Sequence, residues 1–168
     1  MSHVPVLLQS SIDSLALKSG DVFLDATLGG GGHSEAVARQ FGDKVRIVAI
    51  DLDSKTLHKA TERVNKLTKN FSAFQGNFRN LDLILDQAGA EVNKILFDLG
   101  ISSIQLEESG RGFTFKKNEP LLMTMSDDAS NNFSGDDKAS DTAKDLQNAP
   151  IKFTAKDIVN TWTEEHLV

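Results

Sequence analysis

The stretch from Val22 to Ser34, VFLDATLGGGGHS, constrains the fold more than any other part of the chain. Its apolar start predicts a buried strand, and four consecutive glycines then remove every side chain from the turn that follows. Helical spacing of apolar residues resumes at once and closes at Gly42, which predicts a strand, a glycine loop and a helix. Glycine adopts positive φ and lets a ligand approach the backbone closely. Such a loop suits a nucleotide-like ligand, and a plain surface turn is the alternative for the glycines taken alone.

Strands and helices alternate along the first part of the chain. Further strands are expected at Val45–Ile50, Phe71–Gln75 and Asn93–Leu99, and helices at Pro5–Leu17, Ser54–Leu67 and Leu81–Ala88. Asp53 or Ser54 is expected to cap one of these helices, Asn80 the next, and Thr154 a last helix near the C-terminus. Alternating strands and helices form βαβ units, so the sequence predicts an α/β fold with a parallel sheet in the order 3-2-1-4.

Composition excludes several classes of protein. The 168 residues include no cysteine, so the chain forms no disulfide and no thiolate metal site, and its scattered histidines predict no metal centre. No apolar run approaches the ~20 residues of a membrane span, so we expect no membrane association and a cytoplasmic location. The net charge of −6 argues against a general nucleic-acid binder with a basic surface. Residues 126–150 carry −4 of that charge and predict a flexible acidic insertion.

Three chemistry-bearing side chains follow the predicted strands at one edge of the sheet. Asp51 ends the second strand and is placed to accept both hydroxyl protons of a ribose, its alternative being an ordinary loop aspartate. Phe78 follows the third strand and suits an adenine face, or else packs in the core. Asp98 ends the fourth strand, and Ser102 follows it on the same rim. Both a dinucleotide site and an S-adenosylmethionine site fit this pattern, although GGGGHS departs from the G-x-G-x-x-G of dinucleotide sites.

Several motifs together are more specific than any of them alone. They are HVPVLL at 3–8, DATLGGGGHS at 25–34, AIDLD at 49–53, NF at 77–78, LFDLGISSIQL at 96–106, RGFTF at 111–115 and NTWTEE at 160–165. With these motifs the chain resembles the RsmH (MraW) methyltransferases, which methylate N4 of a cytidine in the decoding region of small-subunit ribosomal RNA. The resemblance implies a Rossmann-like class I methyltransferase fold, S-adenosylmethionine as cofactor, and small-subunit rRNA or the assembled small subunit as partner.

The resemblance also implies which residues contact the cofactor. Its cofactor-contacting positions correspond here to Gly31, Gly32, His33, Asp51, Phe78, Asp98 and Gln105. Asp98 is the first candidate for the acceptor of the N4 proton and Ser102 the second. C5 methylation of cytosine uses a cysteine nucleophile, which this chain lacks. RNA contacts are expected at Arg111, Phe113, Lys116 and Lys117, whose alternative is a solvated loop with phenylalanines packed on the core.

The chain departs from the family pattern in two places. Leu122-Met123-Thr124-Met125 stands where the family has D-M-R-M, so one acid and one arginine are absent. Four strands are expected, whereas a complete sheet of this class has seven, which predicts an N-terminal part of a longer protein. We expect a cofactor-binding domain over residues 1–110 and the start of a helical, substrate-recognising insertion over 111–168. The fourth strand is then an open apolar edge, from which we expect self-association.

Overall fold

A computed structural model describes residues 5–125, 154–163 and 165, and the chain divides into two compact units, Met1–Ser103 and Ile104–Val168. The expected flexible segment at 126–150 lies outside the described residues. None of the helices in the described ranges is both long and apolar enough to cross a membrane.

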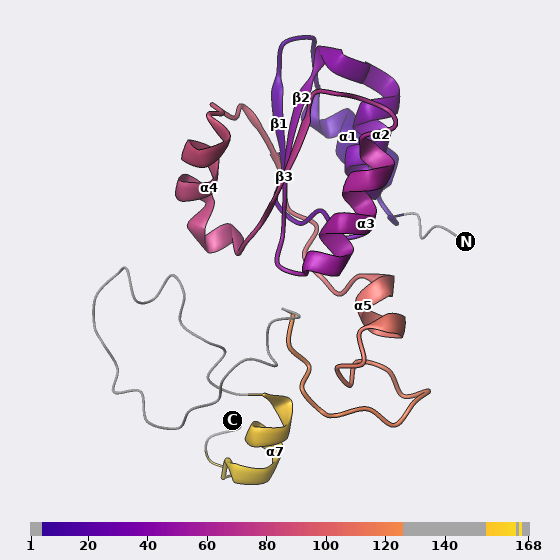
Figure 1. Cartoon of the computed structure of the whole chain (residues 1–168), viewed down its shortest axis with the longest axis vertical. Coiled ribbons are helices and arrows are strands. Elements are labelled where there is room, and N and C mark those ends of the chain that lie inside the picture. The colour runs from indigo at the N-terminus through magenta and orange to yellow at the C-terminus, as the bar shows by residue number, and fades with distance from the viewer. Residues whose placement is uncertain (1–4, 126–153, 164, 166–168) are drawn as a thin grey trace. The chain divides into compact units, whose positions relative to one another are not determined.

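The first unit is built on one parallel sheet of four strands (Figure 1). The strands are β1 (Val22–Asp25), β2 (Arg46–Asp51), β3 (Phe71–Gln75) and β4 (Lys94–Leu96). Their order is β3-β2-β1-β4, which confirms the predicted order. At the carboxyl end of β1, Asp25 lies opposite Ala49 of β2 and Leu96 of β4. Strands β1 and β4 therefore end opposite one another, and β2 continues two residues further, to Asp51.

Helices cover both faces of this sheet. Figure 1 shows α1 (Leu8–Leu15), α2 (Gly32–Phe41) and α3 (Ser54–Val64) on one face and α4 (Leu81–Ala88) on the other. Two short 3-10 helices, η1 (Gly42–Lys44) and η2 (Phe78–Asn80), connect elements of the unit. Because both faces are covered, the strands read as nearly continuous apolar runs rather than as alternating ones.

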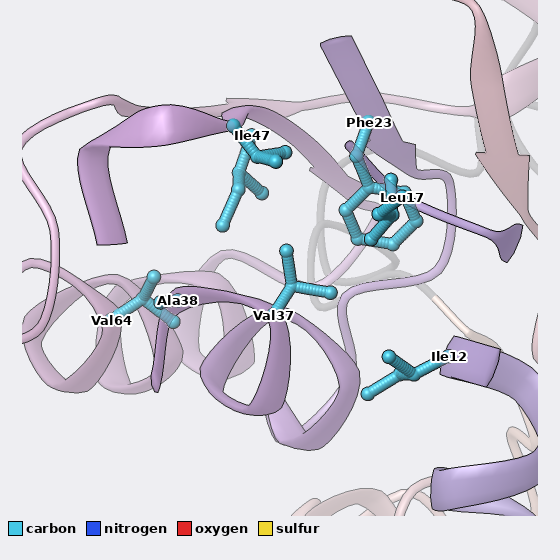
Figure 2. Packing of buried hydrophobic residues seen from close by; sticks show 8 residues of the cluster. Ile12, Leu17, Phe23, Val37, Ala38, Ile47 and Val64 are labelled. Carbon is cyan, nitrogen blue, oxygen red and sulfur yellow. The ribbon is translucent and has the colours of Figure 1, made fainter. Parts of the chain in front are cut away.

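The core on the α1–α2–α3 side joins the two central strands to all three helices (Figure 2). Phe23 of β1 and Ile47 of β2 are fully buried and pack with Val37 of α2, Val64 of α3 and Ile12 of α1. The residues that follow the two strand residues, Leu24 and Val48, face the other side and pack against α4. Successive strand residues thus supply two separate cores, and this burial fixes the register of β1 against β2.

The helix caps test the local predictions. Asp53 caps α3, since its carboxylate accepts the Thr56 N–H at 2.9 Å, and Gly42 and Gly89 close α2 and α4 as predicted. The prediction that Asn80 caps α4 is wrong, because its side chain makes no cap hydrogen bond there. The chain enters α4 through the 3-10 helix η2, which Asn77 caps by accepting the Arg79 N–H at 3.0 Å.

Besides α3, which ends at Val64 instead of Leu67, two predicted elements are shorter in the structure. The first helix ends at Leu15 because Ala16 adopts a left-handed conformation with φ of 47°, which turns Leu17 into the core. Strand β4 ends at Leu96 instead of Leu99, since the backbone N–H of Asp98 donates to Thr27 Oγ1 at 2.7 Å instead of continuing the ladder with β1. Both departures depend on contacts that a local pattern does not contain.

The second unit contains α5 (Ser103–Glu108), which begins at the last residue of the first unit, and α7 (Ala155–Thr161). Thr154 caps α7 as predicted, in a capping box where its backbone N–H and hydroxyl both contact Asp157. The amides of Ala155 and Lys156 donate to the carbonyls of Leu122 and Leu121, so the start of α7 is hydrogen-bonded to the chain that follows α5.

The outer edge of β4 predicts self-association. Among the described residues β4 pairs only with β1. Ile95, 44% exposed, lines a groove between β4 and α1 whose other lining residues are Leu7, Leu15, Leu96 and the serines Ser10, Ser11 and Ser14. Sedimentation velocity at increasing concentration should reveal oligomers, and Ile95→Lys should reduce them because a charge on an edge strand opposes pairing. Leu83→Lys on α4, at 47% exposure, is the matched control and should leave association unchanged. Equal effects of the two variants would contradict an edge contact.

Candidate functional site

The candidate site lies where the parallel strands of the first unit end. The glycine loop follows β1, Asp51 ends β2, Phe78 follows β3, and Asp98 follows β4. Ligands of open α/β sheets bind outside this carboxyl edge, where the strand order reverses. The reversal falls between β1 and β4, so the glycine loop and Asp98 flank it.

The glycine loop is held by backbone hydrogen bonds at both ends. The Leu28 N–H donates to the Ile50 carbonyl at 2.8 Å, and the Gly31 N–H donates to the Leu28 carbonyl at 2.7 Å. Gly31 has φ of 80°, and a Cβ there would lie 3.0 Å from the Ala60 side chain on α3. A Cβ on Gly32 would lie 2.8 Å from Pro5. Gly31 and Gly32 are therefore required by packing, whatever ligand the loop binds.

Gly30, by contrast, has open space around it, since a Cβ built there would meet nothing within 4 Å. A Cβ on Gly29 would come 4.0 Å from the Cβ of Ser102, which places Ser102 beside the loop. The loop thus presents bare backbone at its middle and packed backbone where α2 begins. That division supports close approach of a ligand to Gly29 and Gly30.

Asp51 ties β2 to the glycine loop. One carboxylate oxygen accepts the Gly29 N–H at 2.7 Å and the other accepts the Asp53 N–H at 2.9 Å. Burial raises the pKa of the Asp51 carboxyl, and the hydrogen bonds from Asp53 and Gly29 oppose that rise. Each oxygen of an ionised carboxylate accepts about two hydrogen bonds, so acceptor capacity remains for hydroxyl donors of a ligand. Asp51 is consequently both a brace for the loop and a candidate ligand contact.

Asp98 is the exposed carboxylate of the site. Its side chain is 58% exposed, and its Oδ2 lies 3.8 Å from Nδ1 of His33, whose side chain is 7% exposed. The hydrogen bond of its backbone to Thr27 fixes where the chain leaves β4, directly beside the loop. The structure therefore brings Asp98, His33 and the start of α2 together, as the sequence predicts.

Phe78 lies at the same edge of the sheet and pairs with a second aromatic ring, that of Phe97. Its ring meets the ring of Phe97 edge to face, with centroids 5.5 Å apart and an interplanar angle of 86°. Phe78 is 43% exposed and Phe97 46% exposed, so neither ring is a core residue. Phe97 falls within the strand predicted at Asn93–Leu99, and the early end of β4 places it at the site instead. The sequence feature that could have identified Phe97 as a site residue is its position directly before Asp98.

A buried hydrogen bond between Asp25 and Ser34 was also missed. Asp25 ends β1, Ser34 lies in the first turn of α2, and the Ser34 hydroxyl donates to Asp25 Oδ2 at 2.7 Å. Both residues are essentially inaccessible, and Asp25 Oδ1 has no well-formed hydrogen-bond partner among the described residues. Burial raises the pKa of the Asp25 carboxyl, against the opposing hydrogen bond from Ser34. The pair joins the two ends of the glycine loop, and an acid that ends a strand before such a loop is the signal for it.

The remaining predicted site residues belong to the second unit. Gln105 is 6% exposed and its amide donates to the Met125 carbonyl at 3.4 Å. Arg111 is also 6% exposed, donates to the same carbonyl at 3.1 Å and lies 6.0 Å from the Phe113 ring. Lys116 and Lys117 are exposed. A cofactor contact for Gln105 and RNA contacts for the other four residues stay predictions.

Comparison with known proteins agrees with this geometry. The sequence model of the MraW methylase family matches residues 1–149. The chain belongs to the MraW methylase family. Its members include curated relatives named ribosomal RNA small subunit methyltransferase H. One from Fusobacterium nucleatum is 34% identical over 98% of this chain and 46% of its own length. One from Carboxydothermus hydrogenoformans is 38% identical over 99% of this chain and 46% of its own length.

This chain thus spans about half the length of the curated relatives that it matches. Among solved structures, NSun6 from Pyrococcus horikoshii with SFG matches 67% of this chain and 28% of its own, at 24% identity and a TM-score of 0.48. The family likeness agrees with the four-stranded parallel sheet, which is an incomplete Rossmann-like sheet.

Replacing Ser34 by alanine tests the buried pair. The change removes the hydrogen bond that Asp25 accepts, so we expect the free energy of unfolding in urea to fall by about 1–3 kcal/mol at neutral pH. Burial holds the folded-state pKa of Asp25 above its ordinary 3.8, so acidification protonates the folded state first and relieves the buried charge. The loss should therefore shrink as the pH falls toward 3.8.

Ser14→Ala is the control for this variant. The Ser14 hydroxyl donates to the Ser10 carbonyl at 2.8 Å on the exposed side of α1, and its loss should change the free energy of unfolding by less than about 0.5 kcal/mol. A Ser34→Ala loss that does not depend on pH would contradict the role given to the Asp25 carboxylate.

Proposed function

We propose that the carboxyl edge of the sheet binds S-adenosylmethionine and that the protein methylates N4 of a cytidine in the decoding region of small-subunit ribosomal RNA. The observation that carries the proposal is the meeting of the glycine loop, Asp51 and Asp98 at one sheet edge. Membership of the MraW methylase family supports a methyl transfer. The names of the curated relatives support small-subunit rRNA as the substrate.

The residues present fit such a cofactor. Gly30 leaves space at the loop, Asp51 retains acceptor capacity for two ribose hydroxyls, and the exposed Phe78 ring offers a face to adenine. Gly31, Gly32, His33 and Asp98 complete the proposed contacts in the first unit, and a cofactor contact for Gln105 stays a prediction of the family resemblance. When bound, S-adenosylmethionine supplies an electrophilic methyl group on a sulfonium. A dinucleotide fits less well. Dinucleotide sites have the pattern G-x-G-x-x-G, and here His33 and Ser34 stand in the region of its third glycine.

The reaction sets a positioning problem for the protein. The exocyclic amine of cytosine is a weak nucleophile because its lone pair is delocalised into the ring. A methyltransferase accelerates the attack chiefly by holding the amine in line at about 3–3.5 Å from the methyl carbon. It also needs an acceptor for the N4 proton. Asp98 is the proposed acceptor, since it is ionisable, exposed and next to His33, and Ser102 beside Gly29 is the second candidate.

The substrate is an RNA base, so the target cytidine has to be presented unstacked, at a cost of a few kcal/mol. Small-subunit rRNA, free or in the assembled small subunit, is the proposed partner, and the cytoplasm is the proposed location. The residues proposed to contact RNA on the second unit are Phe113, Lys116 and Lys117, whereas Arg111, which the sequence predicted with them, is only 6% exposed. A second candidate function is a cofactor-binding module without activity of its own, which the 58% exposure of the Asp98 side chain favours.

Replacing Asp51 by alanine tests the cofactor site. We expect isothermal titration calorimetry with S-adenosylmethionine or its demethylated product to show binding weakened by roughly 1.5–3 kcal/mol, because charged hydrogen bonds are lost. The wild-type affinity should also fall on acidification at pH values above 3.8, since burial raises the pKa of Asp51 and the ionised carboxylate is the better acceptor. Asp51→Ala should lack this part of the pH dependence.

Asp13→Ala is the matched control for Asp51→Ala, because Asp13 is an exposed carboxylate on α1, away from the sheet edge, and accepts a hydrogen bond from Gln9. Tighter binding of NAD than of S-adenosylmethionine by the wild type would contradict the proposed cofactor.

Mass spectrometry of digested RNA tests the activity. The chain is incubated with S-adenosylmethionine and small-subunit particles, and N4-methylcytidine is quantified. The Asp98 side chain is 58% exposed, so the surrounding protein does not enclose it. A misplacement of the catalytic group by about 1 Å lowers the rate roughly a hundredfold. We therefore expect cofactor binding with little product. Asp98→Asn keeps the shape of the side chain but not its basicity and should remove the remaining product. A product level that Asp98→Asn leaves unchanged would favour the cofactor-binding module, and robust turnover would contradict the argument from exposure.

A further inference from the structure

Phe115 is the most exposed large apolar side chain among the described residues, with a relative exposure of 107%. It lies between α5 and α7 in the second unit and is followed directly by Lys116 and Lys117. A single exposed apolar residue indicates nothing by itself. Here, however, several hydrogen bonds hold the segment that carries the ring, residues 111–125, in place. Two cations also follow the ring in sequence.

The base of this segment is fixed by Arg111 and Gly112. The Arg111 carbonyl accepts the Met123 N–H at 2.7 Å, and the buried guanidinium donates to the Met125 carbonyl at 3.1 Å. The Gly112 N–H donates to the Glu119 carboxylate at 3.0 Å. A Cβ on Gly112 would lie 2.5 Å from the Pro120 carbonyl oxygen, so the two arms of the segment touch at this point.

The tip is braced as well. The Lys116 N–H donates to Thr114 Oγ1 at 3.2 Å, which fixes the backbone on both sides of Phe115. The Lys117 ammonium donates to the Glu107 carbonyl at 3.0 Å, which ties the tip to α5 and leaves two of its three protons for other acceptors. The ring is therefore presented to solvent by an ordered segment, so binding a partner through it costs little conformational entropy.

We infer that Phe115 stacks on an unpaired base of the RNA substrate while Lys116 and Lys117 contact the adjoining phosphates. Flat aromatic rings beside cations are the combination with which proteins hold single-stranded RNA. This inference rests on the proposed function and assigns a contact residue that the sequence analysis omitted. It also assigns Arg111, which is buried and bonded to Met125, to holding the segment instead of contacting phosphate.

Three substitutions at Phe115 distinguish stacking on a base from an apolar contact that needs no flat ring. Binding of the whole chain to a cytidine-rich single-stranded RNA oligonucleotide is measured by fluorescence anisotropy, and stacking by quenching of a single 2-aminopurine in that oligonucleotide. Phe115→Ala should weaken binding roughly 5- to 100-fold and abolish the quenching. Phe115→Trp should retain both, since its ring is flat, whereas Phe115→Leu should behave like Phe115→Ala. Val159→Ala, at an exposed apolar position of α7, is the control and should change neither.

Salt dependence tests the lysines. Lys116→Gln and Lys117→Gln should each lower the slope of log K against log salt by roughly one, the value for one lost phosphate contact. Lys156→Gln, at an exposed position of α7, should leave the slope unchanged. Thermal unfolding of each variant confirms that it is folded.

The outcomes separate this inference from the proposed function. RNA binding by the wild type that survives Phe115→Ala would overturn the inference alone. RNA binding that Phe115→Leu preserves but Phe115→Ala loses would indicate an apolar contact without stacking and would also overturn it. If the wild type binds S-adenosylmethionine but no RNA, both the inference and the RNA substrate of the proposed function fail.

Discussion

Helices cover strands β1 and β2 on both faces, so every side chain between Phe23 and Asp25 and between Ile47 and Ile50 is buried. Polar chemistry in this unit is therefore confined to the ends of the strands. All four strands are parallel, so the ends that carry Asp25, Asp51 and the chain leading to Asp98 fall at the same edge. The apolar interior thus decides where the functional groups meet, although none of them lies within it except Asp25.

That confinement has an energetic consequence at the glycine loop. A loop without side chains has no apolar contacts with which to order itself, and ordering backbone costs roughly 1–2 kcal/mol per residue. Two carboxylates at the strand ends supply the order instead, Asp51 through the Gly29 amide and Asp25 through the Ser34 hydroxyl. Both have a raised pKa because burial disfavours their charge. Hydrogen bonds from the Gly29 amide and the Ser34 hydroxyl oppose the cost of burying these carboxylates. The same bonds hold the loop backbone in a preformed surface at the edge of the sheet.

In the second unit a guanidinium group, instead of carboxylates, holds a segment of backbone in place. The hydrophobic clusters of the described residues include no residue that follows α5, and there a buried arginine, Arg111, hydrogen-bonds to the carbonyl of Met125. A guanidinium holds several donors in a rigid plane and remains charged, which suits it to fix backbone carbonyls. The cations that face solvent are the lysines at the tip of the segment.

Much of the fold was predictable from the sequence because its determinants are local or periodic. Apolar runs marked β1 and β2, and Asp53, Thr154 and the closing glycines marked helix ends through hydrogen bonds that span three or four residues. The positions of Asp51 and Asp98 followed from the same patterns, since a parallel sheet gathers its strand ends. Tertiary structure alone decided that β4 ends at Leu96, that Phe97 pairs with Phe78, that Asp25 binds Ser34 and that Arg111 is buried. Each of these outcomes depends on a three-dimensional contact, such as that of Thr27 with Asp98, which residue spacing along the chain does not encode.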